Sequence, residues 1–208
     1  MNLTVHSLAH PVTALGPGRR VVLWVAGCAK HCEDCMSPEM QDSEAGKVIP
    51  VATLLNRLLE LDPRLDGLTL SGGEPFDQPA ALAALLRALR LERPQWNVLI
   101  YSGYTLNEIC SDMTGRAEVL NHVDVLIDGR YRKDVPPHQP LVGSGNQCIH
   151  YLTQRGRGLR PDIEAAPPQQ LNWGLGDGSF DMLIGVADES LRDTVREALG
   201  ERPEHGHG

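Results

Sequence analysis

The sequence predicts an α/β fold, built as one domain from parallel βα units. Two observations lead to this prediction. Short apolar runs alternate along the chain with longer segments of helical periodicity, and each of these runs ends at a polar turn that contains glycine. The length of 208 residues suits one domain, and 41% of the residues are hydrophobic, which is enough for a core.

Four apolar runs of strand length are spread over the first 130 residues. Turn residues bound them, as expected for strands of an α/β fold, and they cover residues 20–26, 67–71, 97–101 and 122–127. Between them, apolar residues recur with helical spacing. The helical segments are 51–61, 79–92 and a short one that begins at Leu106. Because strands and helices alternate, the strands are expected to lie parallel in one sheet.

The pattern weakens after about residue 130, where Pro, Gly and charged residues become frequent. The elements predicted there are strands at 149–152 and 180–186 and a helix at 188–199, with loops at 130–147 and 155–170. We expect residues 1–200 to form one domain and residues 201–208 to be a disordered tail.

Composition and charge exclude several classes of protein. The net charge of −8 and the pI of about 5.4 argue against a broad nucleic-acid interface, which would need a basic face. No run approaches the ~18 apolar residues of a membrane span. The N-terminus lacks the charged and apolar regions of a secretory signal. We therefore expect a soluble, cytoplasmic protein that binds neither nucleic acid nor membrane.

Three of the five cysteines lie within eight residues, as Cys28, Cys32 and Cys35. This spacing supplies three thiolates, whereas a closed zinc site or an ordinary [4Fe–4S] cluster takes four ligands. Three thiolates on a cubane cluster leave one iron open for a substrate or cosubstrate. The alternative is a zinc site completed by a histidine, Cys110 or Cys148. Otherwise we expect Cys110 and Cys148 to be buried, inert thiols.

Polar signals also follow the other predicted strands. Gly72-Gly73-Glu74-Pro75 follows the second strand, Ser102 the third and Asp128-Gly129 the fourth. The carboxyl ends of parallel strands meet at one edge of the sheet, and α/β proteins place their sites there. We therefore expect these turns and the cysteines to build a single site.

The cysteine motif after one strand, with Gly-Gly-Glu-Pro after the next, resembles the radical S-adenosylmethionine superfamily. Further motifs between residues 10 and 152 resemble the activating enzymes of glycyl radical proteins, and most of all the activating proteins of anaerobic ribonucleotide reductase. These motifs are Gly16-Pro17-Gly18, Gly27-Cys28, Ser37-Pro38-Glu39, Tyr101-Ser102-Gly103-Tyr104, 124–129 and Gly143-Ser144-Gly145-Asn146-Gln147.

The resemblance implies an incomplete TIM-like barrel of parallel βα units, with the cluster loop after the first core strand. It implies a [4Fe–4S] cluster on Cys28, Cys32 and Cys35, and S-adenosylmethionine as the ligand of the open iron. Reductive cleavage would give methionine and a 5′-deoxyadenosyl radical. That radical would take a hydrogen atom from a glycine of a large glycyl radical partner, with electrons from a flavodoxin- or ferredoxin-type donor.

The resemblance also assigns residues to S-adenosylmethionine. The turn of Gly72, Gly73, Glu74 and Pro75 would receive the ammonium group, because a carboxylate and an ammonium form a charge-assisted pair. Contacts with the remaining groups of S-adenosylmethionine are expected from Ser102, Asp128, Arg130 and Asn146. The alternatives are an ordinary turn with a solvated Glu74, simple turn chemistry at Ser102 and a solvated Arg130.

Two positions depart from the pattern and leave the adenine contacts and the partner open. The residue before the third cysteine, often aromatic in the superfamily, is Asp34, and Ser37 stands where the activating-protein branch tends to have Asn. A stand-alone enzyme acting on a small molecule or peptide is therefore a second hypothesis, to which residues 155–208 could contribute a different pocket. A non-catalytic iron–sulfur or zinc protein is a third.

Overall fold

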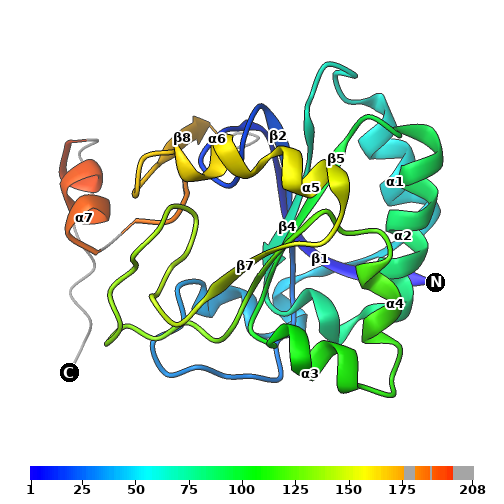
Figure 1. The fold of residues 1–208 in the computed structure, drawn as a ribbon, viewed down its shortest axis with the longest axis horizontal. Helices are drawn as coiled ribbons and strands as arrows, with labels where there is room; N and C mark the ends of the chain where they lie inside the picture. Colours follow the sequence, from blue (N-terminus) through cyan, green and yellow to red (C-terminus); the bar gives the residue numbers. More distant parts are fainter. Residues whose placement is uncertain (176–180, 188, 199–208) are drawn as a thin grey trace.

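A seven-stranded mixed sheet forms the centre of the computed structural model, which describes residues 1–175, 181–187 and 189–198 (Figure 1). The strand order is β3-β1-β2-β4-β5-β6-β7. The strands are β1 (Asn2–Val12), β2 (Arg20–Val25), β3 (Lys47–Pro50), β4 (Gly67–Gly72), β5 (Asn97–Ser102), β6 (Val125–Asp128) and β7 (Cys148–Tyr151). The predicted α/β class is confirmed.

Only the middle of this sheet is parallel. Strands β2, β4, β5 and β6 pair in parallel, whereas β1 runs antiparallel to β2 and β3, and β7 runs antiparallel to β6. The four strands that were expected to lie parallel are these four, so that expectation is confirmed, and the antiparallel strands lie at the two edges of the sheet. No helix separates β1 from β2, or β6 from β7, and a connection without a crossover helix favours antiparallel pairing.

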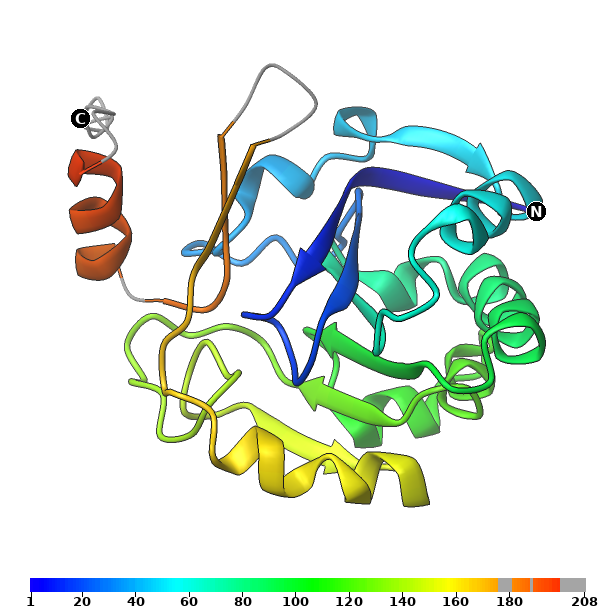
Figure 2. The same cartoon turned by 90° about the horizontal axis from the view of Figure 1, so that it is seen from above.

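Four helices cover one face of the sheet. They are α1 (Val51–Glu60), α2 (Pro79–Glu92), α3 (Leu106–Ser111) and α4 (Arg116–Leu120), which Figures 1 and 2 show on the same side. Short 3₁₀ turns lie at Pro38–Met40, Ser43–Ala45 and Pro75–Asp77. Helices α5 (Gln154–Gly158) and α6 (Arg160–Glu164) follow β7. The antiparallel pair β8 (Asn172–Leu175) and β9 (Asp181–Ile184) comes next, before helix α7 (Glu189–Ala198).

Buried residues of the central strands alternate between the two faces of the sheet. In β2, Val21, Leu23 and Val25 join the core under the helices, while Val22 and Trp24 pack in a second cluster on the other face. This alternation follows from the two-residue period of a strand. Because both faces are covered, β2 is a nearly continuous apolar run, which is why the sequence revealed it.

The amino ends of the central strands are tied together by a buried arginine. Arg20 is fully buried and donates hydrogen bonds to Thr69 Oγ1 (2.6 Å), Leu68 O (2.9 Å), Pro17 O (3.1 Å) and Asn97 Oδ1. Burial lowers the pKa of the Arg20 guanidinium to about 10, so it stays charged at neutral pH. This end of the sheet is closed by satisfied polar groups, and the opposite end holds the predicted site.

Three expectations about secondary structure need correction. Strand β1 was not predicted, although its buried Leu3 and Val5 alternate with less buried neighbours. The segment 155–170, predicted as loop, contains α5 and α6. Thr153 caps α5 by accepting a hydrogen bond from Gly156 N (3.0 Å), and two glycines in that short helix hid its periodicity. Helix α4 was also missed, and the tail predicted at 201–208 lies outside the described residues.

Candidate active site

A cavity of about 480 Å³ opens at the carboxyl ends of the central strands, a volume typical of small-ligand sites. Of the residues predicted for the site, its wall contains Cys28, Cys32, Cys35, Gly72, Gly73, Glu74, Ser102 and Arg130. Pro75, Asp128 and Asn146 are not part of the wall. The strand-end argument thus brought most of the predicted residues to one place.

The cysteines lie on the loop that follows β2, and this loop is folded back on itself. Cys28 N donates to Gln41 O (2.9 Å), and Gln41 Nε2 donates to Cys32 O (3.3 Å). Cys35 Sγ accepts a hydrogen bond from Ser37 N at 3.4 Å. All three cysteines are half-buried free thiols that face the same cavity. Burial raises the pKa of the Cys28 thiol, so binding of a metal to its thiolate must release a proton.

The donor set fits an iron–sulfur cluster better than a single zinc ion. In the described part of the chain, no three His, Cys, Asp or Glu side chains are gathered so as to hold one metal ion. A closed zinc site needs four ligands, each about 2.0–2.3 Å from the metal. Three soft thiol ligands spread around a cavity with room beyond them suit a larger group that is bound by thiolates.

The two glycines at the end of β4, Gly72 and Gly73, are required by the packing of the cysteine loop. Gly72 has a φ of +104°, and a Cβ there would lie 2.4 Å from Val25 O. A Cβ on Gly73 would lie 2.2 Å from Gly27 O. Hydrogen bonds from Gly73 N to Val25 O and from Glu74 N to Gly27 O, both 2.8 Å, join the two segments. The turn after β4 therefore packs directly on the start of the cysteine loop, where only glycine fits.

Glu74 is buried rather than solvated, which overturns the alternative of an ordinary exposed turn. Its side chain accepts hydrogen bonds at Oε1 from Phe76 N (3.0 Å) and Ser102 Oγ (2.9 Å), and at Oε2 from Gly103 N (2.7 Å). Burial nevertheless raises the pKa of the Glu74 carboxyl to about 7. The carboxyl group joins the turns after β4 and β5 and changes its charge near neutral pH.

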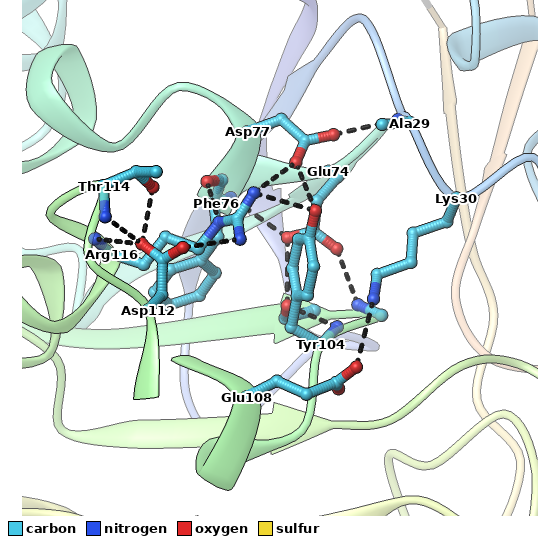
Figure 3. Close-up of polar contacts among 12 residues, drawn as sticks. Ala29, Lys30, Glu74, Phe76, Asp77, Tyr104, Glu108, Asp112, Thr114 and Arg116 are labelled. Atoms are coloured by element: carbon cyan, nitrogen blue, oxygen red, sulfur yellow. Dashed lines mark hydrogen bonds and ion pairs between the residues drawn. The ribbon is translucent and has the colours of Figure 1, made fainter. Parts of the chain in front are cut away.

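A stack of charged groups on Tyr104 fastens the cysteine loop to these turns (Figure 3). Lys30, between the first two cysteines, places its Nζ 3.3 Å from the centre of the Tyr104 ring, with 5% of its side chain exposed. The guanidinium of Arg116 lies over the same ring at 4.0 Å. Lys30 Nζ is also 3.8 Å from Glu108 Oε1. A cation over an aromatic ring is stabilising, and more so when partly desolvated.

Asp77 adds a second connection between the same segments. Its carboxylate accepts hydrogen bonds from Ala29 N (2.9 Å) and Tyr104 OH (2.8 Å), while Arg116 Nη2 donates to Tyr104 OH at 2.9 Å (Figure 3). Sequence analysis missed Lys30, Asp77 and Arg116. The only signal in the sequence was the position of Lys30 inside the cysteine motif.

Asp128 holds structural elements together instead of lining the cavity. Asp128 Oδ2 accepts a hydrogen bond from Leu106 N, at the start of α3, and lies 3.0 Å from His150 Nε2 on β7. The predicted Asp128 is therefore a support for α3 and β7 beside the cavity.

Arg130 is exposed at the cavity wall, and Asn146 supports its backbone from outside the wall. Asn146 Nδ2 donates to Arg130 O at 2.8 Å. The neighbouring Gln147 lines the cavity, donates to Gly129 O (2.9 Å) and accepts from Gly143 N (2.8 Å). Gln147 is a candidate site residue that the sequence did not single out, although it lies in the quoted Gly143-Ser144-Gly145-Asn146-Gln147 motif.

The expectation that Cys110 and Cys148 are buried was wrong. Both thiols are free and exposed. Cys110 follows Ile109, the residue through which α3 reaches the core, and so faces away from it. Cys148 begins the edge strand β7. Neither thiol belongs to the cavity wall.

Among the residues that the structure describes, no helix combines the length and the apolar character that crossing a bilayer requires.

Comparison with the sequences of known proteins assigns this chain to a family. The sequence profile of a family described as "4Fe-4S single cluster domain" matches residues 14–150. An anaerobic ribonucleoside-triphosphate reductase-activating protein from Pasteurella multocida (strain Pm70) is 35% identical over 146 residues, which is 67% of this chain and 91% of the relative.

Proteins of the same name from two other sources are also similar. The one from Enterobacteria phage T4 is 32% identical over 137 residues, 64% of this chain and 85% of the relative. The one from Escherichia coli (strain K12) is 29% identical over 143 residues, 66% of this chain and 91% of the relative. The chain therefore belongs to the 4Fe–4S single-cluster family of radical S-adenosylmethionine enzymes that includes the anaerobic ribonucleoside-triphosphate reductase-activating proteins.

Proposed function

We propose that this chain is an activating enzyme that generates a glycyl radical on an anaerobic ribonucleotide reductase. It binds a [4Fe–4S] cluster on Cys28, Cys32 and Cys35, and it binds and cleaves S-adenosylmethionine. The fold behind this activity is an incomplete TIM-like barrel, with the cluster loop after its first core strand, in one domain of residues 1–200. The protein works in the cytoplasm with a flavodoxin- or ferredoxin-type electron donor.

One observation supports this proposal above the others. The loop with three cysteines and the Gly72-Gly73-Glu74-Pro75 turn pack against each other through backbone hydrogen bonds of 2.8 Å and share one cavity. An iron–sulfur cluster with a purely structural role needs only its protein ligands. In this chain, polar residues of the turns after the central strands, Glu74 among them, line the same cavity as the cysteines. A polar lining of this kind is what a small charged cosubstrate requires.

Glu74 and the glycines suit the ammonium group of S-adenosylmethionine. Glu74 Oε2 accepts one hydrogen bond, from Gly103 N, and a carboxylate oxygen can accept a second. An ammonium group there would lower the pKa of Glu74 from about 7, so the carboxyl would lose its proton as the ligand binds. Binding of S-adenosylmethionine should therefore strengthen as the pH rises through 7.

The methionine carboxylate is assigned to Arg130, which lines the same cavity as Glu74. Arg130 is exposed at the cavity and carries a guanidinium that can bind a carboxylate with two parallel hydrogen bonds. Asn146 and Gln147 fix the backbone at Arg130 and Gly129 respectively. In this assignment Ser102 positions Glu74 and does not donate to the ligand, because its hydroxyl already donates to Glu74 Oε1.

When bound, the cluster would supply the single electron needed to break the sulfonium C–S bond of the cosubstrate, and the deoxyadenosyl fragment released would take the α-hydrogen of a glycine. The residues of this chain hold the two charged ends of the cosubstrate. Lys30 and Tyr104 keep the cysteine loop in place beside them.

The test is anaerobic and uses the reductase of the same host as substrate. The protein is first reconstituted with iron and sulfide. It is then mixed with dithionite, S-adenosylmethionine and the reductase, and the mixture is frozen and examined by EPR. We expect a persistent glycyl doublet and one 5′-deoxyadenosine per radical, both absent with Cys28→Ala. Cleavage of S-adenosylmethionine without a stored protein radical would refute the activase role.

A second candidate, a radical enzyme acting on a small molecule or peptide, is favoured by one feature. Residues after β7 line part of the cavity, yet they lie outside residues 14–150, which the family profile covers. Turnover of 5′-deoxyadenosine that needs a host metabolite or peptide, and no reductase, would support this candidate.

A further inference from the structure

The cysteine motif carries a buried positive charge. Lys30 lies between Cys28 and Cys32 in the sequence, lines the same cavity as the cysteines, and has 5% of its side chain exposed. Burying a charge costs free energy unless it is paired and hydrogen-bonded, and lysine is among the residues least often buried. The partners of this ammonium group therefore decide how much of its charge stays uncompensated.

The contacts of Lys30 compensate its charge only in part (Figure 3). Its Nζ lies 3.3 Å from the centre of the Tyr104 ring, which is uncharged. Glu108 Oε1 is 3.8 Å away, too far for a hydrogen bond, and 53% of the Glu108 side chain is exposed to water, which screens its charge. No described residue accepts a hydrogen bond from Lys30 Nζ.

The second cation on the same ring is held differently. The guanidinium of Arg116 lies over Tyr104 at 4.0 Å. It forms ion pairs with Asp112 (3.1 Å) and Asp77 (3.3 Å). Arg116 is not part of the cavity wall. The cation outside the cavity is thus neutralised by two close carboxylates, whereas the cation that lines the cavity is not.

Backbone groups of the same loop also favour negative charge on the sulfurs. Hydrogen bonds from the N–H groups of Lys30 and His31 to the Cys28 sulfur lower the pKa of its thiol, against the rise that burial causes. Ser37 N donates to Cys35 Sγ at 3.4 Å. His31 has a φ of +42°, in the left-handed region, and successive N–H groups turned to one side in this way bind anions and iron–sulfur centres. The loop therefore offers partial positive charges to the sulfurs in addition to the full charge of Lys30.

We propose that Lys30 sets the reduction potential of the predicted [4Fe–4S] cluster. The inference rests on the proposed function, which supplies the cluster. When the cluster is reduced, one electron from the external donor adds one negative charge to it, and no bond forms or breaks. The potentials of such clusters depend on nearby charge, on hydrogen bonds to the sulfurs and on exposure to solvent. A desolvated cation stabilises the reduced form, so Lys30 allows a weaker donor than the same loop would need without it.

A potentiometric titration followed by EPR tests this inference without turnover. The reconstituted protein is poised at a series of potentials in the absence of S-adenosylmethionine, and the reduced cluster is measured at each. In Lys30→Met we expect the ratio of reduced to oxidised cluster at a given potential to fall about tenfold, which is about 59 mV for a one-electron couple. Lys30→Arg keeps the cation and should stay within about twofold of the wild type.

Two further variants separate the charge of Lys30 from a loosened loop. Lys47→Met, at an exposed position on β3, makes the same change in net charge and should keep the wild-type potential, because solvent and salt screen exposed charges. Glu108→Gln keeps a side-chain oxygen that can pair with Thr105 at the start of α3 but removes the carboxylate 3.8 Å from Lys30 Nζ. It should raise the ratio of reduced to oxidised cluster about twofold, a shift opposite to that of Lys30→Met.

Iron and sulfide contents show which variants carry an intact cluster. A wild-type potential in loaded Lys30→Met would overturn the inference, and so would an equal shift in Lys47→Met. If Lys30→Met holds no cluster, Glu108→Gln decides, and a potential at or below that of the wild type overturns the inference. A wild-type protein that takes up no cluster would refute the proposed function itself, whereas a cluster whose potential is independent of Lys30 refutes only this inference.

Discussion

The two ends of the central sheet each bury an ionisable side chain, and the two are held very differently. At the amino ends, Arg20 donates to five neutral acceptors and keeps a pKa of about 10, far above the working pH. At the carboxyl ends, Glu74 accepts three hydrogen bonds, yet its pKa is raised to about 7. The first group keeps one charge state, and the second can change its state when a charged ligand arrives.

This difference in pKa distinguishes a side chain that supports the fold, Arg20, from one that belongs to the candidate site, Glu74. Both side chains join neighbouring strands, so hydrogen bonding alone does not distinguish them. Glu74 also lines the cavity with the cysteines, whereas Arg20 does not. A buried charge that titrates near neutral pH beside a cavity is typical of a functional site.

The largest expected effect is at the cysteines. Cys28→Ala, Cys32→Ala and Cys35→Ala should each abolish cleavage of S-adenosylmethionine, because each removes one of three proposed ligands of the cluster. The readout is 5′-deoxyadenosine formed under reducing, anaerobic conditions. Cys110→Ala, at an exposed position on α3, is the control and should keep nearly full activity and iron. Turnover in any of the three variants would contradict the ligand assignment.

The next effect concerns the amino ends of the strands. Arg20→Leu leaves Thr69 Oγ1 and Asn97 Oδ1 buried without their donor and should lower the free energy of unfolding by about 3 kcal/mol. Urea denaturation of the apoprotein measures it. Arg19→Ala, whose side chain is 50% exposed, should change stability by less than about 1 kcal/mol. Equal stability of the two variants would mean that Arg20 does not support the sheet as described.

Glu74 should make stability depend on pH in a predictable direction. Its pKa of about 7 in the folded protein exceeds the value of about 4.3 in an unfolded chain, so the folded state binds more protons between these values. Stability should therefore fall as the pH rises from about 4.5 to 7, by up to about 3 kcal/mol, and then stay level. Urea denaturation of the apoprotein at several pH values should show this slope in the wild type and a flatter one in Glu74→Gln. Equal slopes in both proteins would contradict the raised pKa.

The smallest effect is expected at the Tyr104 stack. Lys30→Met removes the cation over the ring, an interaction of about 0.5–2 kcal/mol, and should speed the loss of iron to a chelator. Lys30→Arg keeps a cation over the ring and should restore most of the retention. The same rate of iron loss in Lys30→Met and the wild type would show that the stack does not hold the cysteine loop.

Local patterns in the sequence predicted the elements with strong periodicity. Helix α2 begins and ends where the spacing of its apolar residues and Pro79 indicated, and β2 was visible as an apolar run. Strand β1 escaped because most of its residues are only partly buried, so its alternation is weak. Helices α5 and α6 are short and are held in part by the Thr153 cap, and their periodicity is too brief to detect.

The candidate site likewise has a part that the sequence predicted and a part that it did not. The rule that parallel strands end at one edge brought the cysteines, Gly72 and Ser102 to one cavity, because it depends only on the order of the elements. The stack of Lys30 on Tyr104 and the place of Ile184 in the cavity wall depend on tertiary contacts between distant segments. No local pattern contains that information, so only the structure could reveal them.

The central claim is that the three cysteines and the turn with Glu74 form one site for a cluster and S-adenosylmethionine. EPR of the reconstituted, reduced protein before and after addition of S-adenosylmethionine tests it most directly. We predict a signal of a reduced [4Fe–4S] cluster whose g values shift when the cosubstrate is added, with a smaller shift in Glu74→Gln at the same concentration. A cluster signal that S-adenosylmethionine leaves unchanged would contradict the account.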